Sequence, residues 1–460
     1  MVGGSAQARQ PESLPMPAHG VVGVDTAQLS PSFWLARLQQ PDRVIMNPRA
    51  VADYNVRVQR LDPQVYDVRA LPSTLDGKQI AGWIRALSVR PKKTMYDVHG
   101  QPVPAATLDA LVDSLALDRV PTVQTVRHGL VVQRAALRNF PTLLRVFSRP
   151  GDTDIDRFQE SAMVPGTPVA ILHQSRDKQW WFVEAPRYRA WVEKRYIAVG
   201  SAAQVFGYAD QTPWLVVTGA SARTVFTPEQ PAASQLLLDM GTRVPLRPDW
   251  PADQPVNGQG PSAAQVIELP VRQADGSLGF TEALLARTAD TQDAYLPLTQ
   301  ANIVRQAFKF LGERYGWGHA YDGRDCSGFV ADVYRSMGVL MPRNTSAQAI
   351  SPAANRSHFD ASSTPAERMR AVEHLQVGDL IYIPGHVMMM LGHLHGQPYV
   401  IHDVLDASFR DASGGMRNVK LNEVSVTPLL PLMFNDRQSF VERMTSIVRI
   451  RPPDPGPRGN

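Results

Sequence analysis

The spacing of hydrophobic residues changes twice along the chain and divides it into three parts. From about residue 125 to residue 250, hydrophobic and polar positions alternate over short stretches that are rich in Val, Trp, Phe and Tyr. Turn residues separate these stretches, so each is predicted to be a short β-strand. The strands fall into two groups, each of a size that suits a small barrel. We therefore predict two small β-barrels, at residues 125–200 and 201–290.

The part before the barrels has a helical period instead. Ser30 and Asn47 are each followed by proline, which is the arrangement of a helix N-cap with proline in the first turn. A third helical stretch covers residues 73–88. We predict a helical segment over residues 30–124 that packs on another part of the chain.

The part after the barrels contains both the helical spacing and the strand-like alternation of hydrophobic residues. Residues 298–318 place apolar side chains on one helical face, and a second helix is predicted to begin at Cys326. Residues 378–404 then alternate as strands joined by a turn at Gly396. This pattern predicts an α+β domain over residues 291–451. With the helical segment and the two barrels, the predicted fold is multidomain.

Composition and charge narrow the possible partners. The chain is 43% hydrophobic and 20% charged, with a net charge of +4. It has no dense block of Lys and Arg, so no nucleic-acid partner is predicted. It has no run of 18 apolar residues, so no transmembrane segment is predicted. Residues 1–29 and 452–460 are polar and rich in Pro, and are predicted to be disordered.

The single cysteine, Cys326, is the first candidate for chemistry. One cysteine excludes an internal disulfide and a zinc site built on several cysteines. Asp325 stands at the predicted N-cap of the helix that Cys326 begins, where the helix dipole favours a thiolate. A nucleophilic thiol and a buried structural thiol are both compatible with this position.

A nucleophilic cysteine needs a base and a group that orients the base. His386 opens an apolar strand after a Pro-Gly turn, and His402 and Asp403 lie on the next strand. His402 and Asp403 face opposite ways, so only one of them can reach His386. We prefer His402, because a polar side chain inside a strand needs a hydrogen-bond partner.

Two other clusters have simpler interpretations. The pair His393 and His395 could be metal ligands together with His402, but an exposed hairpin turn explains them better. The run Met388–Met390 is typical of core packing. We expect neither a metal nor a cofactor.

Six short motifs occur in order: Tyr-x-Trp-Gly, Asp-Cys-Ser-Gly-Phe-Val, Pro-Arg, Gly-Asp-Leu, Gly-His-Val and Ile-His. Together they resemble the NlpC-type cysteine peptidases of bacterial cell walls. Residues 33–48 and 137–192 also resemble the N-terminal segment and first bacterial SH3-like barrel of one subgroup. This subgroup is the dipeptidyl-peptidase-VI-like γ-D-glutamyl-L-diamino acid endopeptidases. The resemblance implies a papain-like α+β catalytic domain preceded by two SH3-like barrels.

The resemblance also implies roles and a substrate. Cys326 would be the nucleophile, His386 the base and His402 the orienting residue. The substrate would be a peptidoglycan stem peptide, L-Ala-γ-D-Glu-diaminopimelate, cut after the γ-D-glutamyl unit through a thioester. By the same resemblance, Glu160 and Tyr188 would bind the free N-terminal ammonium of the substrate. The residues that position the peptide around the nucleophile would be Tyr315, Asp325 and Ser327. A periplasmic or cell-envelope location is expected, with cytoplasmic recycling of murein as the alternative.

Two residues depart from the family pattern. His319 follows Gly318 where the family has a second glycine, and Asn344 stands where relatives often carry an acid. These departures support a rival hypothesis, in which the protein binds or organises the cell wall through its barrels and has a degenerate peptidase domain.

Overall fold

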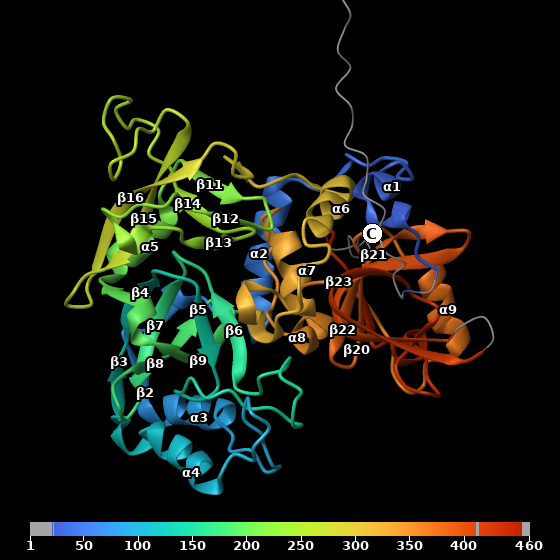
Figure 1. Cartoon of the computed structure of the whole chain (residues 1–460), viewed down its shortest axis with the longest axis horizontal. Helices are drawn as coiled ribbons and strands as arrows, with labels where there is room; N and C mark the ends of the chain where they lie inside the picture. Colours follow the sequence, from blue (N-terminus) through green and yellow to red (C-terminus); the bar gives the residue numbers. More distant parts are fainter. Residues whose placement is uncertain (1–20, 22, 411–413, 453–460) are drawn as a thin grey trace, which may run out of the picture.

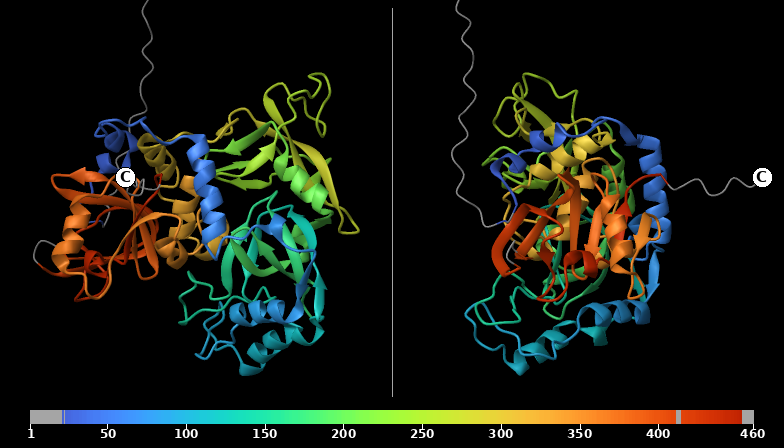
Figure 2. Two further views of the ribbon diagram at one scale, coloured as in Figure 1. Left: turned by 180° about the vertical axis from the view of Figure 1, so that it is seen from behind. Right: turned by 90° about the vertical axis from the view of Figure 1, so that its right-hand side faces the viewer.

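The computed structural model describes residues 21, 23–410 and 414–452, and it forms three lobes that meet around helix α2 (Pro48–Leu61) (Figures 1 and 2). Most of the two ends predicted to be disordered lies outside the described residues. Thr26–Leu29 is an exception, because it forms a 3-10 helix in which Gln28 is buried. Among the described residues, no helix has the length and hydrophobicity that crossing a membrane requires.

The helical segment divides between two different cores. Helices α1 (Pro31–Leu35) and α2 pack on the C-terminal domain, where the ring of Trp34 lies 5.4 Å from that of Tyr399. Helices α3 (Gly77–Leu87) and α4 (Ala105–Ser114) pack on the first barrel instead. The segment therefore joins the two lobes, as Figure 2 shows.

The first barrel is one antiparallel sheet of seven strands in the order β10-β4-β7-β8-β9-β5-β6. Its strands are β4 (Arg127–Val131), β5 (Ala135–Arg138), β6 (Gln159–Met163), β7 (Pro168–Gln174), β8 (Trp180–Ala185), β9 (Tyr188–Glu193) and β10 (Ile197–Gly200). Strand β6 lies at the edge of the sheet and faces the C-terminal domain, so this barrel can supply one wall of a site there (Figure 1).

The second group of strands surrounds a separate core and is less regular. It consists of β11 (Trp214–Val217), β12 (Ser221–Arg223), β13 (Leu237–Asp239), β14 (Arg243–Pro245), β15 (Ala264–Arg272), β16 (Leu278–Ala286) and β17 (Thr291–Gln292), in three small sheets. Helix α5 (Ala202–Asp210) precedes it and was not predicted, although Ser201 and Gln204 form a capping box at its start.

The C-terminal domain packs helices on an antiparallel sheet, which confirms the predicted α+β fold. The sheet order is β19-β25-β20-β21-β22-β23, and β24 also pairs with β22. Its elements are α6 (Gln300–Phe308), α7 (Cys326–Arg335), α8 (Thr345–Ile350), β19 (Asn355–His358), α9 (Pro365–Glu373), β20 (Leu380–Ile383), β21 (His386–Leu394), β22 (Gln397–Arg410), β23 (Met416–Pro428), β24 (Leu432–Met433), α10 (Phe440–Arg443) and β25 (Ser446–Arg449). β21 and β22 form the predicted hairpin, with its turn at His395 and Gly396.

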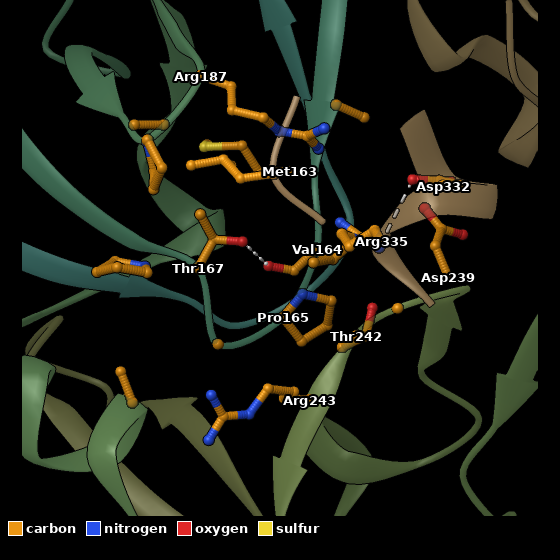
Figure 3. Close-up of a pocket in the computed structure, with 18 of the residues that line it drawn as sticks. Met163, Val164, Pro165, Thr167, Arg187, Asp239, Thr242, Arg243, Asp332 and Arg335 are labelled. Carbon is orange, nitrogen blue, oxygen red and sulfur yellow. Dashed lines mark hydrogen bonds and ion pairs between the residues drawn. The ribbon is translucent and has the colours of Figure 1, made fainter. Parts of the chain in front are cut away.

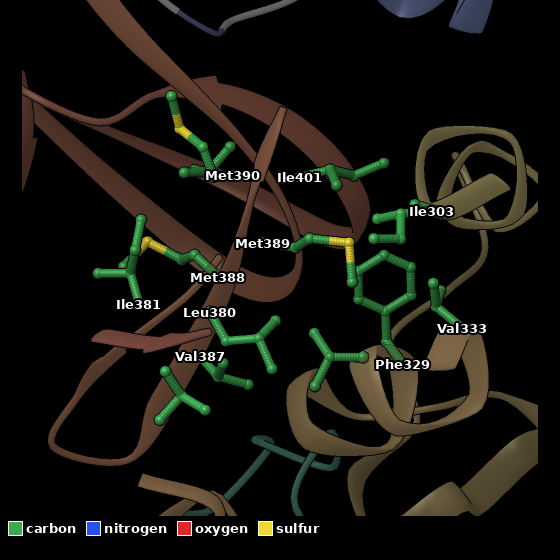
Figure 4. Close-up of a cluster of buried hydrophobic side chains, with 14 of the residues drawn as sticks. Ile303, Phe329, Val333, Leu380, Ile381, Val387, Met388, Met389, Met390 and Ile401 are labelled. Atoms are coloured by element: carbon green, nitrogen blue, oxygen red, sulfur yellow. The ribbon is translucent and has the colours of Figure 1, made fainter. Parts of the chain in front are cut away.

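The three methionines of β21 are fully buried, so their predicted packing role is confirmed. Met389 points toward Phe329 of α7 and Ile303 of α6, whereas Met388 and Met390 lie on the other face of the strand (Figure 4). This packing holds α7 against β21, the two elements that carry Cys326 and His386.

Candidate active site

Cys326 is the first residue of α7 and is 5% exposed. Its sulfur lies 3.6 Å from the hydroxyl of Thr345, and it accepts a hydrogen bond from the backbone N–H of Val387. Val387 directly follows His386, so the thiol lies next to the residue predicted to be its base. The sequence did not single out Thr345, because a lone threonine at the start of a helix has many ordinary roles.

The two histidines form the contact that was predicted. Nε2 of His386 lies 2.7 Å from Nδ1 of His402, and Nε2 of His402 lies 2.9 Å from the hydroxyl of Thr427. His402 is fully buried. Strand pairing explains the alignment, because β22 pairs with both β21 and β23. The result is a chain of three side chains that ends at Nδ1 of His386, the nitrogen left for the thiol proton.

The pKa values in the site do not favour the thiolate that the helix dipole led us to expect. Burial and the neighbouring Asp325 raise the pKa of the Cys326 thiol to about 12. Burial lowers the pKa of His386 to about 4, and it holds the pKa of His402 well below the ordinary histidine value. The helix dipole is therefore outweighed, and without substrate the site holds a neutral thiol and a neutral imidazole. Neutral His386 is the form that can act as a base.

Asp325 holds the nucleophile's helix in place. Its carboxylate accepts hydrogen bonds from the backbone N–H groups of Gly328 at 2.9 Å and Gly318 at 3.0 Å. The buried guanidinium of Arg343 pairs with the same carboxylate at 2.8 Å and donates to the hydroxyl of Ser327 at 3.0 Å. Asp325 and Ser327 thus have internal partners, which indicates that they position the site as well as line it.

The first barrel reaches this cluster through β6. Arg343 donates to the hydroxyl of Ser161 at 2.8 Å, and the indole of Trp317 donates to the backbone oxygen of Gln159 at 3.0 Å. Glu160 lies between these two contacts along β6. The barrel residues predicted to bind substrate therefore lie next to the groups that flank Cys326.

Glu160 and Tyr188 are joined by a short hydrogen bond from the phenol to the carboxylate. Burial raises the pKa of the Glu160 carboxyl, and the hydrogen bond from Tyr188 opposes this. The side chain of Asn344 is hydrogen-bonded to Tyr188. One of the two departures from the family pattern therefore belongs to the predicted ammonium site.

Tyr315 and Asp403 are buried close to Cys326 and Asp325. Tyr315 is buried, and its pKa is raised well above the ordinary value by burial, with Cys326 and Asp325 adding to the effect. Asp403 is fully buried, and within the described residues neither of its carboxylate oxygens has a hydrogen-bond partner. Burial raises the pKa of Asp403 well above its ordinary value, and the hydrogen-bond partner of His386 is His402.

His319, the other departure, is buried beside the helix of the nucleophile. Its Nε2 lies 2.2 Å from where a side-chain carbon on Gly328 would stand, so a larger residue at 328 would require His319 to move. Burial lowers the pKa of His319 well below the ordinary value. His319 therefore packs against the first turn of α7, and burial there favours its neutral imidazole.

The predicted histidine turn carries no metal cluster. Among the described residues, no group of three or more His, Cys, Asp or Glu side chains is arranged to hold a metal ion. His395 lies in the exposed turn between β21 and β22.

Comparisons with known proteins agree with this fold. The NlpC/P60 family model matches residues 312–418, and the model of the SH3 domain of SH3b1 type matches residues 145–193. The structure of an NlpC/P60 endopeptidase from Photobacterium damselae subsp. piscicida is similar to this one, with a TM-score of 0.70 at 16% identity. That similarity covers 89% of this chain and 94% of the other.

A second solved structure, an NlpC/P60 family protein from Bacillus cereus ATCC 10987, gives a TM-score of 0.42 at 19% identity. It covers 70% of this chain and 99% of the other. A search of curated proteins found no match.

The chain carries an SH3b1-type domain followed by an NlpC/P60 domain. The C-terminal domain is therefore of the NlpC/P60 type.

Proposed function

We propose that the protein is a γ-D-glutamyl-diamino acid endopeptidase that acts on stem peptides with a free N-terminal L-Ala. The observation that carries this proposal is the position of Glu160. It brings a carboxylate of the first barrel next to the Arg343–Asp325 pair that flanks Cys326. A substrate bound between the barrel and Cys326 thus has an acidic group at one end and a nucleophile at the other.

Glu160 and Tyr188 suit an ammonium group. A carboxylate and a phenol oxygen can both accept hydrogen bonds from it, and charge-assisted bonds of this kind are strong. Binding the ammonium would oppose the effect of burial on the Glu160 pKa, because a nearby cation favours the ionised carboxyl. A stem peptide still attached to glycan has no such charge and meets the wall formed by β6.

The chemistry follows from the order of the hydrogen bonds. Nδ1 of His386 takes the proton of Cys326 as the sulfur attacks the γ-carbonyl carbon of D-Glu. The N–H groups of Cys326 and Ser327, at the start of α7, have no partners within the helix and can stabilise the oxyanion, whereas that of Gly328 is bonded to Asp325. The imidazolium then gives its proton to the departing amine, which leaves a thioester. His386 next takes a proton from water, which attacks the thioester and releases L-Ala-D-Glu.

The test compares two substrates. The enzyme should release diaminopimelate from L-Ala-γ-D-Glu-diaminopimelate and should fail with the N-acetylated peptide. Equal cleavage of both would remove the proposed role of Glu160 and Tyr188.

No observation among the described residues favours the rival hypothesis, in which the protein organises the cell wall and its peptidase domain is degenerate. Its support was His319 and Asn344, but His319 packs behind α7 and Asn344 contacts Tyr188 without displacing it. The substrate places the proposed activity in the periplasm or cell envelope, with murein recycling in the cytoplasm as the alternative.

A further inference from the structure

A cavity of about 520 Å³ lies between the two barrels, α2 and the outer half of α7 (Figure 3). The thiol and the paired histidines do not line it, but Tyr188 of the proposed ammonium site does, so the cavity adjoins that site on the side away from Cys326. Met163, Val164 and Pro165 of the first barrel form an apolar wall, and Asp332 and Arg335 of α7 stand on the other side. Its volume is that of a small-molecule site.

One cation in this cavity has no partner. Arg187, in the turn between β8 and β9, extends into the cavity toward the side where Asp332 and Arg335 stand (Figure 3). No hydrogen bond or ion pair joins its guanidinium to any other described residue. Burial lowers the pKa of Arg187 to about 10, so the group still carries its charge at neutral pH. Arg187 is partly exposed, to the cavity, and its charge is only partly solvated there without an ion-pair partner to compensate.

The nearby carboxylates are already occupied. Asp332 pairs with Arg324 at 3.1 Å and with Arg335 at 3.8 Å. Asp239 pairs with Arg134 at 2.9 Å and with Arg324 at 3.2 Å. These ion pairs join the three lobes, and neither carboxylate forms an ion pair with Arg187, although the charge of Asp332 acts on it from a distance.

Two further guanidinium groups add to the positive charge. Arg343 is bound to Asp325, and Arg243 stacks on the ring of Trp214 at 4.2 Å. Both line the cavity. The cavity therefore combines an excess of positive charge with an apolar wall.

We propose that this cavity binds a small organic anion, whose carboxylate or phosphate oxygens pair with Arg187 while its apolar part lies against Met163, Val164 and Pro165. The flat guanidinium can pair with two oxygens of either group at once. A ligand here contacts all three lobes, so its binding stabilises their arrangement. This site goes beyond the proposed peptidase activity and does not depend on it.

The experiment measures thermal unfolding of the full chain in chloride buffer of constant ionic strength. Benzoate tests an aromatic carboxylate, phenyl phosphate an aromatic phosphate, and inorganic phosphate the ion alone. We expect a saturable rise in Tm with at least one of them, because a ligand that binds only the folded state stabilises it. The probe that acts at the lowest concentration identifies the class of anion.

Arg187→Met removes the charge, and Arg187→Gln is a second variant that keeps a polar side chain. Arg195→Met is the matched control, because Arg195 lies on the surface of the same barrel and pairs with Glu193. Arg195→Met should respond to the probe as the native chain does, and both Arg187 variants should lose at least nine-tenths of the response. Without ligand, Arg187→Met should have an unchanged or higher Tm. The proposal is overturned if no probe gives a saturable shift, or if the Arg187 variants respond like the native chain.

Discussion

Nε2 of His386 and Nδ1 of His402 lie 2.7 Å apart, and this hydrogen bond determines which tautomer each ring adopts. A base at Nδ1 of His386 requires the ring proton on Nε2, which donates to Nδ1 of His402. His402 must then carry its own proton on Nε2, which donates to the hydroxyl oxygen of Thr427 at 2.9 Å. The Thr427 oxygen therefore stabilises the tautomer in which His386 can act as a base.

Thr427→Val should lower kcat and leave KM nearly unchanged. The valine removes the acceptor for His402, and the ring then favours the tautomer that leaves His386 with a proton on Nδ1. We expect a loss of about 10-fold or more, the effect of a hydrogen bond of about 1–3 kcal/mol. Thr427→Ser keeps the hydroxyl and should recover most of the rate. A valine variant as active as the native enzyme would show that Thr427 has no part in setting the tautomer.

The pH profile of kcat/KM should extend unusually far into acid. His386 must be neutral to act as a base, and burial lowers its pKa from 6.5 to about 4. Activity should therefore persist as the pH falls through the ordinary histidine range and be lost toward about pH 4. Below 6.5 the unfolded chain gains a proton that the folded His386 does not, so stability also falls. A profile with its acid limb near 6.5 would contradict a buried base.

Alkylation of the free enzyme should be slow at neutral pH. The thiolate is the reactive form, and burial with Asp325 raises the pKa of Cys326 to about 12. The rate of reaction with iodoacetamide should rise with pH throughout the range in which the protein stays folded. Rapid reaction at neutral pH would mean that Cys326 and His386 form an ion pair before substrate binds.

Glu160→Gln should raise KM for peptides with a free N-terminus. The glutamine cannot form the charge-assisted bond to the ammonium, so a rise of about 10- to 100-fold is expected, with a smaller effect on kcat. Glu193→Gln is the matched control on the same barrel, because Glu193 forms a surface ion pair with Arg195. If the two variants have the same KM, Glu160 does not bind the ammonium.

Predicting the main features of this site needed only short motifs. Cys326 begins a helix and His386 begins a strand, and both positions follow from local capping and turn signals. The alternation of side chains along β22 separated His402 from Asp403. These inferences succeeded because each depends on neighbours in sequence.

Other features depend on contacts between distant segments. Thr427 reaches His402 only through the register of β22 and β23, and Arg343 reaches Ser161 only when the first barrel docks. A single threonine or arginine carries no sequence signal for such contacts. The helix dipole that favours a thiolate can be read from the sequence, whereas the burial that raises the pKa of Cys326 cannot.

The most direct test is the release of diaminopimelate by Cys326→Ala. Removing the sulfur removes the only proposed nucleophile, so the rate should fall by at least about 10³-fold, while thermal unfolding shows that the variant remains folded. Native-like release of diaminopimelate by folded Cys326→Ala would contradict the thioester mechanism.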